Sequence, residues 1–173
     1  TGVLSNAAQV LPAEQRRRLA LAARSDTTIR VIAPNEVGTP ALLPAGTGAT
    51  RTWRFHAANV RDVAWAAAPN FLWDASGWEG VLIQALYPPA ALPLWGKAAA
   101  MGRHTIEQHS ARWFRYPYPT AINVNGPVGG MEYPMIVFCS ERRDEFDLYY
   151  VTTHELGHIW YPMIVGSNER LYG

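Results

Sequence analysis

The sequence contains one cysteine and few charged residues. A single thiol, Cys139, cannot form an internal disulfide, which excludes a small fold held together by disulfide bridges. Its place in the apolar run MIVFC predicts a buried strand thiol and not a nucleophile. Asp, Glu, Lys and Arg make up 17% of the 173 residues, and the formal net charge is +1. This weak positive charge offers little attraction to a polyanion, so we expect no nucleic-acid partner.

Long apolar segments are also missing. The uncharged stretch from Val81 to Gly96 is too short to span a bilayer, and Pro88, Pro89 and Pro93 interrupt it. We therefore expect no membrane span. Apolar residues nevertheless make up 49% of the chain, which is enough for a sizeable hydrophobic core.

A five-residue motif near the C-terminal end carries the clearest chemical information. Residues 154–158 read HELGH. On an α-helix, residues four apart lie on the same face, so the imidazole rings of His154 and His158 can bind one metal ion. Glu155 is rotated by about 100° from His154 and flanks that ion, where it can hold a water molecule. The spacing predicts half of a zinc site with a general base beside it.

These residue types suit metal-assisted hydrolysis. Neutral imidazole binds Zn²⁺ well, and a catalytic zinc site keeps an open position for water. The metal lowers the pKa of that water from about 15.7 toward about 7, and a carboxylate can accept its proton as it attacks a polarised carbonyl. We therefore predict that His154 and His158 bind zinc and that Glu155 is the catalytic base. The alternative is an accidental match on a helix with two surface histidines.

Periodicity predicts the secondary structure around the motif. Residues 144–160 are expected to form a helix with acidic residues in its first turn, and Pro162 is expected to end it. A second long helix is expected at 94–114, where His104 and His109 are interpreted as surface or packing residues. Further segments are a helix at 12–24, a loop at 34–50, and strands at 27–33, 52–58, 62–68, 71–74, 80–87, 120–124 and 134–139.

Two motifs together resemble a known family. Residues 154–162, HELGHIWYP, are similar to the H-E-x-x-H-x-W-[FY] zinc helix of the alanyl aminopeptidase group of gluzincin metallopeptidases. Residues 129–134, GGMEYP, resemble the G-x-M-E-N exopeptidase motif of the same group, with Tyr133 in place of the usual Asn. The two motifs also follow the order and spacing of the family.

The resemblance implies roles for residues outside the zinc helix. Glu132 would bind the free α-amine of a peptide substrate, and the cleft beside it would be lined by Gly129, Gly130 and Met131. A fixed carboxylate near the metal selects an ammonium one residue before the scissile bond. The resemblance further implies one Zn²⁺ ion whose third protein ligand, and a transition-state-stabilising tyrosine, lie beyond Gly173.

The resemblance also predicts an α+β fold with two parts. Residues 53–70, WRFHAANVRDVAWAAAPN, look like the end of the N-terminal β-domain of the family. We therefore expect residues 1–69 to be the C-terminal part of a β-rich domain, and residues 70–173 to be the first part of a thermolysin-like (gluzincin) catalytic domain. An edge strand carrying residues 129–132 would let an extended peptide add alongside it.

Three functional hypotheses stay open. The first is a zinc aminopeptidase that removes N-terminal residues from peptides with a free N-terminus. On this hypothesis residues 1–173 alone are expected to be inactive, because two ligands hold zinc weakly. The second is a thermolysin-like endopeptidase, which would also cut N-acetylated peptides. The third is a non-catalytic peptide-binding or scaffold domain with an incomplete metal site.

Overall fold

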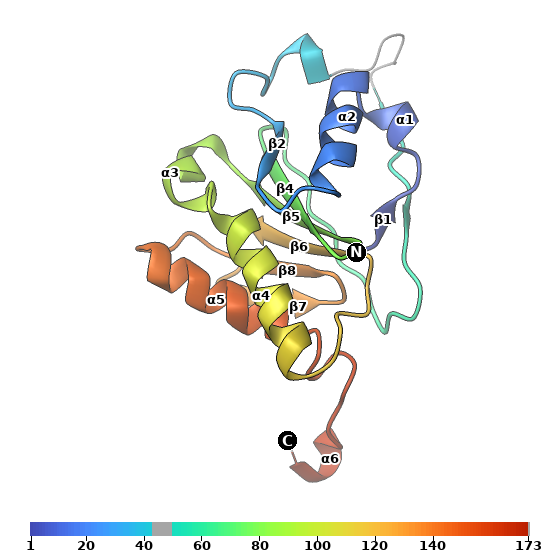
Figure 1. Ribbon diagram of the computed structural model, residues 1–173, viewed down its shortest axis with the longest axis vertical. Helices are drawn as coiled ribbons and strands as arrows, with labels where there is room; N and C mark the ends of the chain where they lie inside the picture. Colours follow the sequence, from blue (N-terminus) through green and yellow to red (C-terminus); the bar gives the residue numbers. More distant parts are fainter. Residues whose placement is uncertain (43–49, 173) are drawn as a thin grey trace.

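A six-stranded sheet runs through the computed structural model, which describes residues 1–42 and 50–172 (Figure 1). The strands, in spatial order, are β2 (Ile29–Ile32), β4 (Leu72–Trp78), β5 (Val81–Tyr87), β6 (Thr120–Asn125), β8 (Ile136–Cys139) and β7 (Gly130–Tyr133). The neighbours β5, β6 and β8 run parallel, whereas β2, β4 and β7 pair antiparallel with their neighbours. The fold is therefore mixed α/β, which is compatible with the predicted α+β class.

Two long helices cover one face of the sheet. α4 (Ala98–Arg112) packs against β4 and β5, α5 (Glu145–Gly157) packs against β8 and β7, and the two helices contact each other (Figure 1). Near the other end of the sheet, α2 (Ala13–Ala22) packs against β2 and β4. In the part of the chain that the structure describes, no helix is both long and apolar enough to cross a membrane.

The remaining elements are short. They are β1 (Val3–Leu4), which pairs with β3 (Phe55–His56), the helices α1 (Ala7–Val10), α3 (Leu92–Trp95) and α6 (Glu169–Tyr172), and 3₁₀ turns at Pro40–Leu42 and Pro89–Ala91.

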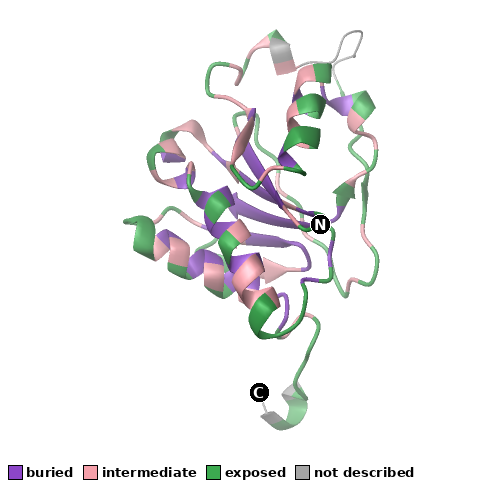
Figure 2. Ribbon diagram, in the orientation of Figure 1, coloured by how far each residue is buried: buried purple, intermediate pink, exposed green. Residues whose placement is uncertain are grey.

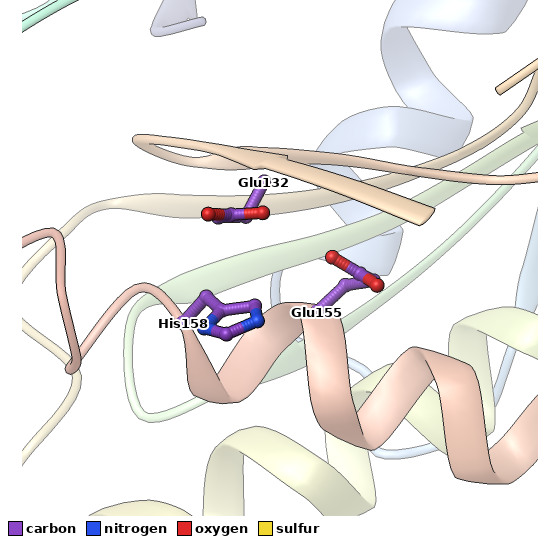
Figure 3. A group of neighbouring side chains, drawn as sticks. All are labelled: Glu132, Glu155 and His158. Atoms are coloured by element: carbon purple, nitrogen blue, oxygen red, sulfur yellow. The ribbon is translucent and has the colours of Figure 1, made fainter. Parts of the chain in front are cut away.

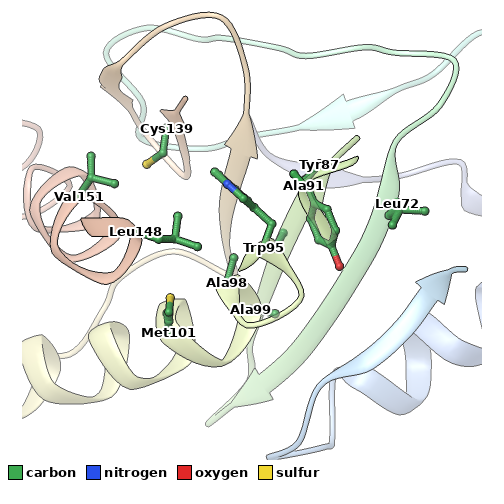
Figure 4. Packing of buried hydrophobic residues seen from close by; sticks show 11 residues of the cluster. Leu72, Tyr87, Ala91, Trp95, Ala98, Ala99, Met101, Cys139, Leu148 and Val151 are labelled. Atoms are coloured by element: carbon green, nitrogen blue, oxygen red, sulfur yellow. The ribbon is translucent and has the colours of Figure 1, made fainter. Parts of the chain in front are cut away.

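Apolar side chains fill the space between the sheet and the two long helices. Trp95, Met101 and Leu148 meet there, and the strands β4 to β6 are buried along most of their length (Figures 2 and 4). Cys139 at the end of β8 belongs to the same cluster and is 0% exposed. Burial raises the pKa of its thiol to about 12, so it is protonated at neutral pH. The prediction of a buried strand thiol is confirmed.

Most predicted elements are present, with one clear exception at 62–68. No strand forms there, although side chains alternate: Val63 and Trp65 are exposed, whereas Ala64 and Ala66 pack on an apolar cluster of the sheet. Ala64, near its centre, bonds instead to Thr1: the Thr1 ammonium donates to the Ala64 carbonyl over 2.6 Å, and the Ala64 N–H donates to the Thr1 hydroxyl over 2.9 Å. The alternation therefore reflects packing of an extended segment on a sheet face, and the strand prediction was wrong.

Other elements differ from the prediction in where they begin and end. The strand expected at 52–58 is limited to β3, and the helix expected at 94–114 is divided into α3 and α4 at Gly96 and Lys97. Part of the loop expected at 34–50 lies outside the described residues. The division at residue 69 stays a prediction. The sheet itself continues across that division, because β2 pairs with β4.

Candidate metal centre

The helix α5 carries the predicted site, and its sequence explains where it begins and ends. The Asp144 side chain accepts a hydrogen bond from the backbone N–H of Asp147 over 2.8 Å, which caps the first turn. Glu145 and Asp147 place negative charge at the same end, where the helix dipole favours it. Regular helix ends at Gly157, and irregular turns lead to Pro162. The predicted helix is confirmed for most of its length.

The two motif histidines turn their rings toward each other. Their Nε2 atoms lie 3.0 Å apart. Two nitrogen ligands on a tetrahedral zinc ion, each about 2.0–2.1 Å from the metal, would be about 3.3 Å apart. The two nitrogens share a hydrogen bond in this structure, and their separation is close to that of two ligands on one ion once the shared proton is lost.

A backbone contact favours the tautomer of His158 that a metal requires. Nδ1 of His158 lies 3.0 Å from the carbonyl oxygen of Tyr161. A carbonyl only accepts hydrogen bonds, so this nitrogen carries the proton and Nε2 presents its lone pair toward His154. The ring of His154 is exposed and stacks on that of Tyr150, with the centroids 6.3 Å apart. The irregular turn after α5 thus has a chemical role, because it supplies the carbonyl that orients His158.

Glu155 lies between the helix and the edge strand β7. It is 6% exposed, and this burial raises the pKa of its carboxyl group. The charges of His154 and His158 lower that pKa, and Glu132 raises it again. A carboxylate with a raised pKa has a stronger tendency to accept a proton, as a general base must.

A second carboxylate faces Glu155 from β7. Glu132, Glu155 and His158 offer ligand atoms that all lie within 4.8 Å of one another (Figure 3). His154 lies outside this limit, although its ring is next to His158. Two carboxylates so close together repel each other, and a cation between them would relieve that repulsion.

Side chains alternate between the two faces of β7, so the predicted cleft residues do not all lie on the same face. Gly130 and Glu132 face α5, and a Cβ atom added to Gly130 would overlap Oε1 of Glu155. Met131 pairs with Phe138, which packs on the opposite face of the sheet, so alternation directs Met131 away from α5. Gly129 lies before the strand, where an added Cβ would be 4.0 Å from Ser140 Oγ. The role of these residues in substrate binding stays a prediction.

Two histidines of α4, His104 and His109, contact the site helix α5. His109 Nε2 lies 3.3 Å from the carbonyl oxygen of Thr153, and its ring packs against Trp113 and Trp160. Burial lowers the pKa of His109, which keeps the ring neutral. His104 contacts the Tyr149 hydroxyl over 2.7 Å. The interpretation of these histidines as surface or packing residues is confirmed, because His104 is exposed and His109 is partly buried.

No family model matches this chain. A search of curated proteins also finds no match. The resemblance to alanyl aminopeptidases therefore remains a prediction from the two motifs, and the geometry around α5 and β7 is the independent basis for a functional proposal.

Proposed function

We propose that this chain carries the zinc-binding part of an aminopeptidase with a thermolysin-like catalytic domain, which hydrolyses the N-terminal residue from peptides. One observation carries the proposal: the Nε2 atoms of His154 and His158 meet at 3.0 Å beside the buried carboxylate of Glu155. His154 and His158 would hold the ion. Bound zinc would polarise the substrate carbonyl and lower the pKa of a water molecule.

Glu155 takes the role of general base in this proposal. Its carboxylate accepts a proton from the attacking water and then donates it to the amine of the leaving group. Burial supports this role, because the raised pKa brings the carboxyl group closer to neutral pH. The neighbouring Gly130 supports it as well, since the missing side chain leaves room for the carboxylate against β7.

The pair of carboxylates favours exopeptidase action over endopeptidase action. Glu132 and Glu155 bring two carboxylates within 4.8 Å of each other, and neither forms an ion pair with Lys or Arg among the described residues. The ammonium of a free N-terminus would neutralise this pair, whereas an internal peptide bond brings no charge. β7 is the outer strand of the sheet, so its free edge offers backbone groups to an extended peptide.

The decisive experiment uses the full-length zinc-loaded protein that contains residues 1–173. Glu155→Gln should leave the zinc content unchanged and lower kcat by about 10²- to 10⁴-fold, the usual contribution of a general base. Glu141→Gln, in the exposed loop after β8, is the matched control and should retain full activity. Substantial turnover by Glu155→Gln would exclude Glu155 as the base.

Substrate choice tests the amine-binding role. The unchanged protein should cleave peptides with a free N-terminus and leave their N-acetylated forms intact. Glu132→Gln should raise KM for the free peptides, because the ammonium loses a charged partner. Equal cleavage of free and acetylated peptides would instead support the endopeptidase alternative.

A further inference from the structure

Arg142, in the loop between β8 and α5, has a polar group without a partner. Its side chain is half-buried, and its Nε is shielded from solvent and donates to no acceptor among the described residues. Within the same residues Arg142 forms no ion pair, whereas its exposed neighbour Arg143 pairs with Asp147 over 3.4 Å. A shielded guanidinium N–H without an acceptor is costly, so its persistence calls for an explanation.

A second unpartnered donor belongs to β6, the strand that pairs with β8. Asn125 ends β6 and is paired in register with Cys139, three residues before Arg142. Its Nδ2 is also shielded and has no acceptor in the described part of the chain. Burial raises the pKa of both Cys139 and Glu155, and the positive charge of Arg142 opposes that rise in each. Both donors therefore lie around Cys139, at the carboxyl ends of β6 and β8.

The register of β7 relates this position to the direction of a bound peptide. Glu132 pairs with Val137, and Gly130 pairs with Cys139. A path along β7 from Glu132 therefore passes Glu155 at Gly130 and then approaches the loop that contains Arg142. Each residue of an extended peptide covers about 3.3 Å of this path. If Glu132 holds the substrate amine, the part released by hydrolysis extends toward Arg142.

We infer that Arg142 and Asn125 form a subsite for a carboxylate on the leaving-group side of the scissile bond. The inference rests on the proposed aminopeptidase function, which fixes the direction of the substrate. Two donors, one of them charged, match the acceptor-only chemistry of a carboxylate. Two sources offer this group: the free C-terminus of a dipeptide and an acidic side chain in the residue after the cleaved bond.

Binding measurements can separate these sources from each other and from the proposed function. The background is the full-length zinc-loaded protein with Glu155→Gln, which leaves the peptides intact. Isothermal titration calorimetry would compare Leu-Ala with Leu-Ala-amide for the C-terminal carboxylate, and Leu-Glu-amide with Leu-Gln-amide for the side chain. Arg142→Gln is then added. Arg143→Gln serves as the matched control, because that side chain is exposed and bound to Asp147.

The expected result is selective. Arg142→Gln should weaken binding of the charged member of one pair by about 10- to 100-fold and leave its neutral member unchanged, and that pair identifies the source. Arg142→Lys should retain part of the preference, because it keeps the charge but loses the planar fork. Arg143→Gln should change neither pair.

Two other outcomes would overturn the inference, and they differ in meaning. Equal affinity for charged and neutral members before and after Arg142→Gln would remove the subsite and leave the aminopeptidase proposal standing. Failure of all four peptides to bind the Glu155→Gln background, with zinc present, would remove the proposed function and the subsite together.

Discussion

The structure buries two carboxylates in opposite surroundings. Asp74 on β4 is 0% exposed and accepts two hydrogen bonds from Arg30, over 2.9 and 3.1 Å, and a third from Tyr87. Glu155 on α5 is 6% exposed, yet its nearest acidic or basic neighbours include a second carboxylate, Glu132. We call Asp74 with Arg30 and Tyr87 the balanced cluster, because it contains a direct ion pair, whereas Glu155 forms no ion pair among the described residues.

The two surroundings have different consequences for stability. The ion pair of Asp74 with Arg30 joins β2 to β4, so removing one partner leaves the other without its counter-charge. A buried carboxylate beside a like charge lowers the stability of the free protein, and a bound cation would relieve that repulsion. The two clusters therefore respond to substitution in different ways, and the following predictions test that contrast.

The largest effect on stability is expected at the balanced cluster. Asp74→Ala leaves the Arg30 guanidinium without its carboxylate partner, and we expect the free energy of unfolding to fall by about 3–5 kcal/mol. Urea denaturation followed by circular dichroism measures it. Asp147→Ala breaks the pair with Arg143, whose side chain is 87% exposed, and should cost far less. Similar losses in the two variants would refute a special role for Asp74.

A smaller effect, on activity alone, is expected from one methyl group in the site. Gly130→Ala pushes the Glu155 carboxylate out of place, because the new Cβ overlaps Oε1. A displacement of about 1 Å can cost about 100-fold in rate, so we expect kcat to fall by that order while the fold persists. Gly166→Ala, an exposed position whose Cβ would lie 3.7 Å from the carbonyl oxygen of Pro162, an ordinary contact, should retain activity. Equal kinetics for both variants would show that Gly130 does not position Glu155.

Removing one hydroxyl from the balanced cluster should have a modest effect. Tyr87→Phe deletes a donor to Asp74, which keeps both hydrogen bonds from Arg30. We expect the free energy of unfolding to fall by about 1 kcal/mol, the usual net value of one hydrogen bond. Denaturation as for Asp74→Ala measures it, and a loss as large as in that variant would mean that the hydroxyl and not the ion pair carries the cluster.

The smallest effect should have the opposite sign. In metal-free protein, Glu155→Gln removes a buried charge next to Glu132, so the unfolding temperature should rise slightly. A carboxyl group whose pKa is raised on folding lowers stability only where it is ionised. The gain should therefore be present at about pH 8 and disappear as pH falls through the raised pKa toward the ordinary value of 4.5. Thermal scans with a chelator at several pH values measure it. A variant less stable than the parent at every pH would show that the charge of Glu155 does not destabilise the metal-free protein.

Local patterns predicted the elements that carry the site. The helix of residues 144–160 has a capping Asp144 and acidic first turn, and the strands at 120–124 and 134–139 are short apolar runs with turn residues around them. Such features depend on neighbours in sequence, which is why their existence could be predicted. The pairing of His154 with His158 follows from helical spacing in the same way.

Features that depend on distant residues could not be predicted. The ion pair of Arg30 with Asp74 joins residues 44 positions apart, and nothing in either local pattern indicates it. The close contact of Gly130 with Glu155 likewise requires the distance between β7 and α5. Segment 62–68 shows the converse error, because a strand-like alternation formed without strand partners.

The single buried thiol gives a direct measure of how the site helix moves. Cys139 packs against Leu148 and Val151 of α5, so an alkylating reagent reaches the sulfur only when the helix separates from β8. The labelling rate under native conditions therefore reports the free energy of that local opening, without any introduced probe. Slower labelling on addition of Zn²⁺ would mean that the ion holds α5 against the sheet, which would couple metal binding to the rigidity of the whole edge.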